Sequence, residues 1–123
     1  MRYTRFSMSI GRTFVLLLAS FSFAAPAYSM SLRELRSLEK SARQGTHYAN
    51  YYLVGVMEGV LEAHAQGVRN GAQASICVNS RRLEPGMAKI LYDSELKRSA
   101  GVYEADMPVQ LVMVQALTTV YPC

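Results

Sequence analysis

Apolar residues in the middle of the chain recur at the spacing of an amphipathic α-helix. Counted from Leu53, they lie three, four, seven, eight and eleven residues further on. Several polar residues lie away from them, at Asn50, Glu58, Glu62 and Gln66. Such a stripe is typical of a helix with one buried face. The pattern predicts a helix from Thr46 to about Gln66, and it favours an all-α fold. The stripe consists of Leu53, Val56, Met57, Val60, Leu61 and His64.

Two further helices are predicted from their end signals. Ser31 and Glu34 have the spacing of a capping box, so a helix begins there and ends at Gln44–Gly45. Another helix begins near Pro85, a residue suited to a first helical turn, and ends at residues 99–101. The expected buried face of this later helix consists of Met87, Ile90 and Leu91.

The last predicted helix carries no charged residue between Pro108 and Pro122. A helix without charges is buried on most sides, either centrally in the domain or partly in a dimer interface. The valine content also permits a buried strand, but the length of the segment favours a helix. The chain is therefore expected to form a small single-domain bundle of about four helices.

Residues 1–29 have the layout of a cleavable secretory signal peptide. A positive start precedes an uncharged, largely apolar stretch over 14–25, which is shorter than the roughly 20 residues of a membrane span. Small residues then allow cleavage after Ala27 or Ser29, and Ser29 is favoured. An uncleaved anchor is the weaker alternative. We expect an exported domain over 30–123 that is not attached to the membrane after cleavage. The positive residues are Arg2, Arg5 and Arg12.

Loss of the signal peptide would remove most of the net charge. The whole chain has a formal charge of +4, and without the three signal arginines it retains ten basic and nine acidic side chains, a net +1. Nucleic-acid binding needs a basic patch on the folded domain. The composition therefore argues against a nucleic-acid partner.

Two cysteines, Cys77 and Cys123, remain in the expected domain. A domain of this size is marginally stable without additional support, and an exported protein can form disulfides. A bond between them would close a loop of about 47 residues and contribute about 4 kcal/mol in the chain-entropy model. A free terminal thiol and an intermolecular bridge are the alternatives.

Small residues form a second stripe on the longest predicted helix, at Gly55, Gly59 and Ala63. Glycine inside a helix costs up to about 1 kcal/mol relative to alanine, so its use here needs a reason. Close packing against another element of the domain or against a second copy is expected, and a partner groove is the less favoured interpretation.

The sequence predicts no catalytic, cofactor-binding or metal site. His47 and His64 are seventeen residues apart, which is not a usual metal-ligand spacing. His64 lies on the apolar stripe and is expected to be a packed, hydrogen-bonded residue. Disulfide-bonded cysteines cannot act as nucleophiles, and no phosphate loop or nucleotide fingerprint is present. A binding or inhibitory protein is favoured over an enzyme.

Three segments resemble one family of proteins. Residues 52–59 (YLVGVMEG) are similar to a Tyr-x-x-Gly-x-x-(Asp/Glu)-Gly helix, and 76–78 (ICV) to a Phe-Cys-x-Pro turn, with Asn79 in place of the proline. Residues 116–123 (ALTTVYPC) are similar to an Ala-Leu-x-x-x-Phe-Pro-Cys ending. In this order, the motifs resemble the Rap/Tai family of type VI secretion immunity proteins over nearly the whole exported domain.

The resemblance implies a helical, often dimeric periplasmic protein in which Cys77 and Cys123 are paired. Its partner would be a peptidoglycan-cleaving amidase effector, which such proteins inhibit by plugging the active-site cleft. A homodimer is therefore expected. A small periplasmic helical chaperone or stress protein, which would have the same size, export and disulfide, is the alternative function.

The candidate contact surface is the connection between the last two predicted helices, from Arg98 to Asp106. It contains a glycine and an aromatic residue, Tyr103, which would anchor the partner, while Glu104 and Asp106 would make polar contacts. The alternative for Tyr103 is that it packs beneath its own loop.

Overall fold

The computed structural model describes residues 29–41 and 43–123 of the chain. Within them lie four helices and no strand: α2 (Leu32–Ser41), α3 (Gly45–Arg69), α4 (Met87–Arg98) and α5 (Val109–Val120). The all-α prediction is confirmed, and the strand alternative for the last segment is wrong. The predicted signal peptide lies outside the described residues except for Ser29. None of the described helices is long and apolar enough to cross a membrane.

The first described helix begins where its capping box predicts. A Glu34 carboxylate oxygen accepts hydrogen bonds from the Ser31 backbone N–H at 2.7 Å and the Ser31 hydroxyl at 2.9 Å. The Glu34 N–H in turn donates to Ser31 Oγ at 3.3 Å. These bonds satisfy helix-end groups that would otherwise lack partners. They also lower the pKa of Glu34 below its ordinary value.

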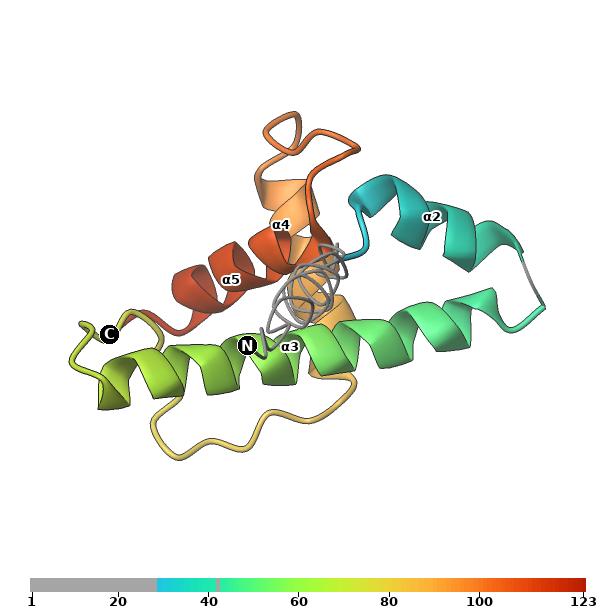
Figure 1. Cartoon of the computed structure of the whole chain (residues 1–123). Helices are drawn as coiled ribbons and strands as arrows, with labels where there is room; N and C mark the ends of the chain where they lie inside the picture. The colour runs from blue at the N-terminus through green and yellow to red at the C-terminus, as the bar shows by residue number, and fades with distance from the viewer. Residues whose placement is uncertain (1–28, 42) are drawn as a thin grey trace, which may run out of the picture.

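The long helix α3 organises the rest of the domain (Figure 1). Helix α2 folds back along the first half of α3, α5 lies against its second half, and α4 packs against both α3 and α5. The apolar stripe predicted for α3 and one face of the uncharged helix α5 provide much of the core. The expectation that α5 is buried on most sides within the domain is wrong, because Leu111, Val114 and Val120 are exposed. The largest fully buried apolar side chains are Leu32, Leu35, Leu53, Met57, Met113, Leu117, Val109 and Val112.

The turn between α2 and α3 requires a glycine. Gly45 is buried, and a Cβ atom there would collide with the backbone carbonyl oxygen of Leu38 and lie 3.2 Å from that of Glu39. Both obstacles are backbone atoms of α2, which cannot rotate away as a side chain can. The absence of a side chain at Gly45 therefore allows the two helices to meet closely.

The predicted disulfide joins Cys77 to Cys123, with 4.9 Å between their Cα atoms. The free-thiol and intermolecular alternatives are wrong, since neither cysteine is free. The Cys77 N–H also donates to the Tyr121 carbonyl oxygen at 2.8 Å, and Ile76 forms an isolated bridge with Pro122. The end of α5 is thus held against the chain that follows α3.

The turn after Cys77 has a backbone conformation that excludes proline. Asn79 has a φ of 51° and Ser80 a φ of 58°, both in the left-handed region. Proline cannot adopt such a φ, because its ring holds the angle near −65°. Asparagine is among the residues that tolerate this region best. Proline at position 79 would therefore be incompatible with this turn.

The predicted buried face of α4 is partly wrong. Ile90 is 65% exposed, whereas the buried stripe consists of Ala88, Leu91, Tyr92 and Glu95. These four positions have the spacing of one helix face. A charged residue can belong to that face because Glu95 receives hydrogen bonds from three side chains, described below. Ile90 lies on a different face of the helix and is exposed.

The small-residue stripe on α3 does not pack within the domain. Gly55, Gly59 and Ala63 are exposed, and a Cβ atom added at either glycine would meet nothing within 4 Å. The prediction that another element of the same domain packs closely on these glycines is therefore wrong. Contact with a second copy stays a prediction.

Candidate functional site

The connection between α4 and α5 forms a loop, residues 99–108, that projects from the helices (Figure 1). Residues 100–104 are called the loop tip below; within them Val102 is 63% exposed, and Gly101 has a φ of 84°, which favours glycine. Glu104 is also exposed. The loop therefore presents an apolar side chain and a carboxylate to solvent.

The first half of the loop is organised around the buried carboxylate of Glu95, which is 1% exposed. Arg98 donates to Glu95 Oε2 through Nη2 and, at 3.1 Å, through Nε. The hydroxyls of Ser99 and Tyr103 each donate to Glu95 Oε1 at 2.8 Å. Both carboxylate oxygens are thus hydrogen-bonded, as a buried charge requires.

These contacts shift the pKa of Glu95 and of Tyr103. Burial alone would raise the pKa of Glu95, but the hydrogen bonds from Arg98, Ser99 and Tyr103 outweigh it and lower the pKa below the ordinary value. Burial, together with the hydrogen bond to Glu95, raises the pKa of Tyr103 to about 12. Glu95 is therefore an anion at neutral pH, and Tyr103 remains a hydrogen-bond donor to it.

The second half of the loop is held by the start of α2. The N–H groups of Leu32 and Arg33 donate to the carbonyl oxygens of Met107 at 3.0 Å and Ala105 at 2.8 Å. The loop thereby satisfies two helix N–H groups that have no partner within α2. Asp106 pairs with Arg33 at 3.0 Å, but both side chains are largely exposed, so this pair contributes little.

The predicted contact residues lie in this loop or at its base, but in different environments. Arg98 and Tyr103 are committed to Glu95, and Tyr103 is half-buried against the core, as the alternative for this residue expects. Glu104 is exposed, and so is Asp106 beside Arg33. The structure thus brings the four residues into one loop region. Whether a partner contacts them stays a prediction.

Two residues of this region, Val102 and Glu95, are not predicted from the sequence. Next to Val102, the tyrosine is the more usual interface residue. A lone glutamate in a helix, such as Glu95, is usually solvated. The spacing of Glu95 from Ala88, Leu91 and Tyr92 was a usable signal, because it places the carboxylate on an apolar face.

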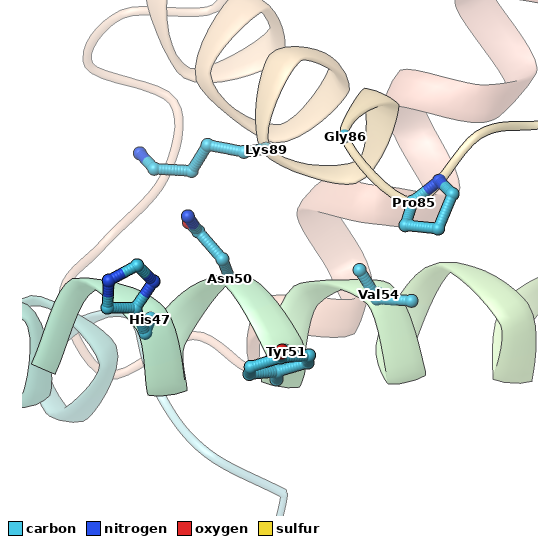
Figure 2. A pocket seen from close by; sticks show the side chains of 7 residues that line it. All are labelled: His47, Asn50, Tyr51, Val54, Pro85, Gly86 and Lys89. Atoms are coloured by element: carbon cyan, nitrogen blue, oxygen red, sulfur yellow. The ribbon is translucent and has the colours of Figure 1, made fainter. Parts of the chain in front are cut away.

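A shallow cleft of about 210 Å³ separates the first half of α3 from the start of α4 (Figure 2). Asn50 points from α3 toward α4, and its Oδ1 atom is buried without a hydrogen-bond partner among the described residues. Lys89, across the cleft, pairs with Asp93 at 2.7 Å and with Glu39 at 3.4 Å. The cleft is lined by His47, Asn50, Tyr51, Val54, Pro85, Gly86 and Lys89.

The titratable side chains that line this cleft are His47, Tyr51 and Lys89. Burial alone would lower the pKa of Lys89, but the hydrogen bond and charge of Asp93 outweigh it and raise the pKa. The amine is therefore a protonated ion-pair partner. Tyr51, which is 76% exposed, forms an aromatic rim.

A larger groove of about 540 Å³ runs between α3 and α5. Its described lining contains no Asp, Glu, Lys or Arg, and it includes Gly59 and Ala63 of the small-residue stripe. His64 borders it as the predicted hydrogen-bonded residue, accepting at Nε2 from the N–H groups of Ser75 at 3.0 Å and Ile76 at 3.2 Å. On the α5 side Val114 is 40% exposed. The groove suits an apolar, uncharged occupant.

The described residues include no cluster of three or more histidine, cysteine, aspartate or glutamate side chains that could hold a metal ion. Comparison with known proteins found no matching family model, no matching curated protein and no matching solved structure.

Proposed function

We propose that this protein is a periplasmic immunity protein that binds a peptidoglycan amidase effector and blocks its active-site cleft, protecting the bacterium that produces it. One observation carries the proposal: the loop 99–108 projects from a helical domain, and both of its ends are held in place. A projecting loop of fixed shape suits insertion into a cleft, because little conformational freedom is lost on binding.

The side chains of the loop tip indicate what kind of partner surface would bind it. Val102 would occupy an apolar part of the cleft, and Glu104 would face a donor or a basic group at its rim. Tyr103 would support these two residues from below through its bond to Glu95. The sequence motifs and the Cys77–Cys123 bond, which resemble the Rap/Tai family, support the same proposal.

The test uses the protein purified after export and a small cysteine–histidine amidase, to be sought first in the adjacent reading frames. We expect a stable complex by calorimetry and loss of peptidoglycan cleavage in the presence of the protein. Val102→Glu should abolish both effects, because it places a charge in the apolar contact. Val68→Glu is the matched control, since Val68 is a 38%-exposed valine at the distant end of α3. Equal inhibition by wild type and Val102→Glu would exclude this loop tip as the contact.

A second candidate function is that of a small periplasmic chaperone, favoured by the uncharged groove between α3 and α5. Apolar segments of unfolded proteins could occupy such a groove. This function predicts that the protein suppresses aggregation of unrelated periplasmic proteins at low pH and that Val114→Glu weakens the effect. Val102→Glu should leave it unchanged. Homodimer formation through the exposed α3 stripe is compatible with either function, and sedimentation at several concentrations tests it.

A further inference from the structure

Glu95 is the one charged side chain that is buried among the residues that the structure describes. Burying a carboxylate is costly unless it is paired and hydrogen-bonded. Here all the donors come from one short stretch of chain: Arg98 at the end of α4, Ser99 directly after it, and Tyr103 at the far side of the loop tip. The carboxylate therefore joins the end of a helix to the loop that follows it.

The position of these donors restricts the loop tip in particular. Ser99 and Tyr103 bond to the same oxygen, Glu95 Oε1, so the chain between them must return to its starting point. Gly101 makes this possible with its positive φ, and the Val102 N–H donates to the Ser99 carbonyl oxygen at 3.1 Å. Val102, between the two donors, is thereby directed to solvent.

We infer that Glu95 is the positioning residue of the binding loop, which keeps Val102 and Glu104 in the shape that a partner recognises without touching the partner itself. The inference rests on the proposed function only in taking this loop as the contact surface. Without the carboxylate, the residues between Ser99 and Tyr103 would sample many conformations, and binding would have to order them again. We expect the affinity for the amidase to fall about 10- to 100-fold.

Two variants test the inference in the whole exported protein. Glu95→Gln keeps the size of the side chain but removes its charge, and Tyr103→Phe keeps the ring but removes one donor. Glu58→Gln is the matched control, because it removes the same charge at an exposed position of α3. Urea unfolding identifies which variants remain folded. Tyr103→Phe keeps the test decisive if Glu95→Gln does not fold.

Two measurements are made on each folded variant. Amide hydrogen exchange in the free protein should rise at least about tenfold over 99–104 in both test variants and remain unchanged in α5, because local opening is set by local contacts. Affinity for the amidase should fall in the same variants and not in Glu58→Gln. Glu95→Gln and Tyr103→Phe combined should lose less affinity than the product of the two single losses, because they break the same contact.

The outcomes separate this inference from the proposed function. If Val102→Glu abolishes binding while Tyr103→Phe changes neither exchange nor affinity, Glu95 is not the positioning residue, and the proposed function stands. If Val102→Glu leaves binding unchanged, the loop is not the contact surface, and the inference fails with it. If no amidase binds, the proposed function fails, and the exchange measurement alone decides whether Glu95 holds the loop. Unchanged exchange would then show that Glu95 does not hold the loop.

Discussion

Two glycines on the same helix should respond to the same substitution in opposite directions. Gly45, at the start of α3, faces the backbone of α2, whereas Gly55, in the middle of α3, faces open space. Alanine at Gly55 should stabilise the protein by about 1 kcal/mol, the difference in helix propensity between the two residues. For a domain of this size, that corresponds to a rise in Tm of about 4–8 °C.

Alanine at Gly45 should be destabilising, because its Cβ would collide with the Leu38 carbonyl oxygen. Neither atom belongs to a flexible side chain, so α2 as a whole must move away from α3. Forcing an extra carbon into a packed site costs about 1–3 kcal/mol. Movement of α2 would also disturb Leu35, which is fully buried beneath it. The two variants should therefore differ by about 2–4 kcal/mol in free energy of unfolding.

The measurement is urea unfolding followed by far-UV circular dichroism on protein purified after export. The slope of the transition should be the same in both variants, so that the midpoints report stability alone. Gly59→Ala, at a second open position, should behave like Gly55→Ala. A loss of stability in Gly55→Ala that grows with protein concentration would refute the claim that Gly55 faces open space, because it would show that a second copy packs on α3.

Three further predictions concern the interior. Replacing Cys77 and Cys123 by serine should lower the free energy of unfolding by about 4 kcal/mol, measured by urea unfolding, and a loss below about 1 kcal/mol would mean that packing alone restrains the loop. Tyr92→Phe should be neutral or stabilising in the same assay, because the Tyr92 hydroxyl is buried without a partner among the described residues; a loss above about 1 kcal/mol would reveal a missed bond. The stability that Glu95 contributes should be complete above the ordinary carboxyl pKa of 4.5 and lost as the pH falls through its lower folded-state value. The stability difference between wild type and Glu95→Gln should therefore shrink between pH 5 and 3, and a constant difference would contradict this.

The helices could be predicted from the sequence because their signals are local. The Ser31–Glu34 capping box identifies the start of α2, and Pro108 identifies the start of α5. These signals depend on hydrogen bonds and sterics within a few residues, so no tertiary information is needed. The pairing of the two cysteines followed from their number and the expected export, and it was confirmed.

Which side of a helix is buried depends on its neighbours, so it could be predicted from the sequence only in part. The stripe at Gly55 and Gly59 indicates that something could approach closely, but not whether the domain contains it. The glycine that does allow close packing, Gly45, looked like a simple helix terminator. Its importance arises from the path of α2 folding back on α3, which no local pattern encodes.

In the candidate site, too, the direction of a side chain depends on tertiary contacts that the sequence pattern does not reveal. An aromatic residue in a glycine-containing loop is expected to face solvent, unless a buried acceptor lies within reach of its polar atom. Glu95 provides that acceptor, eight residues before Tyr103 in the chain. The hydroxyl of Tyr103 therefore turns inward, and Val102 faces outward in its place. Because one carboxylate determines both directions, the exposed surface of this loop should depend more on Glu95 than on any residue that a partner would touch.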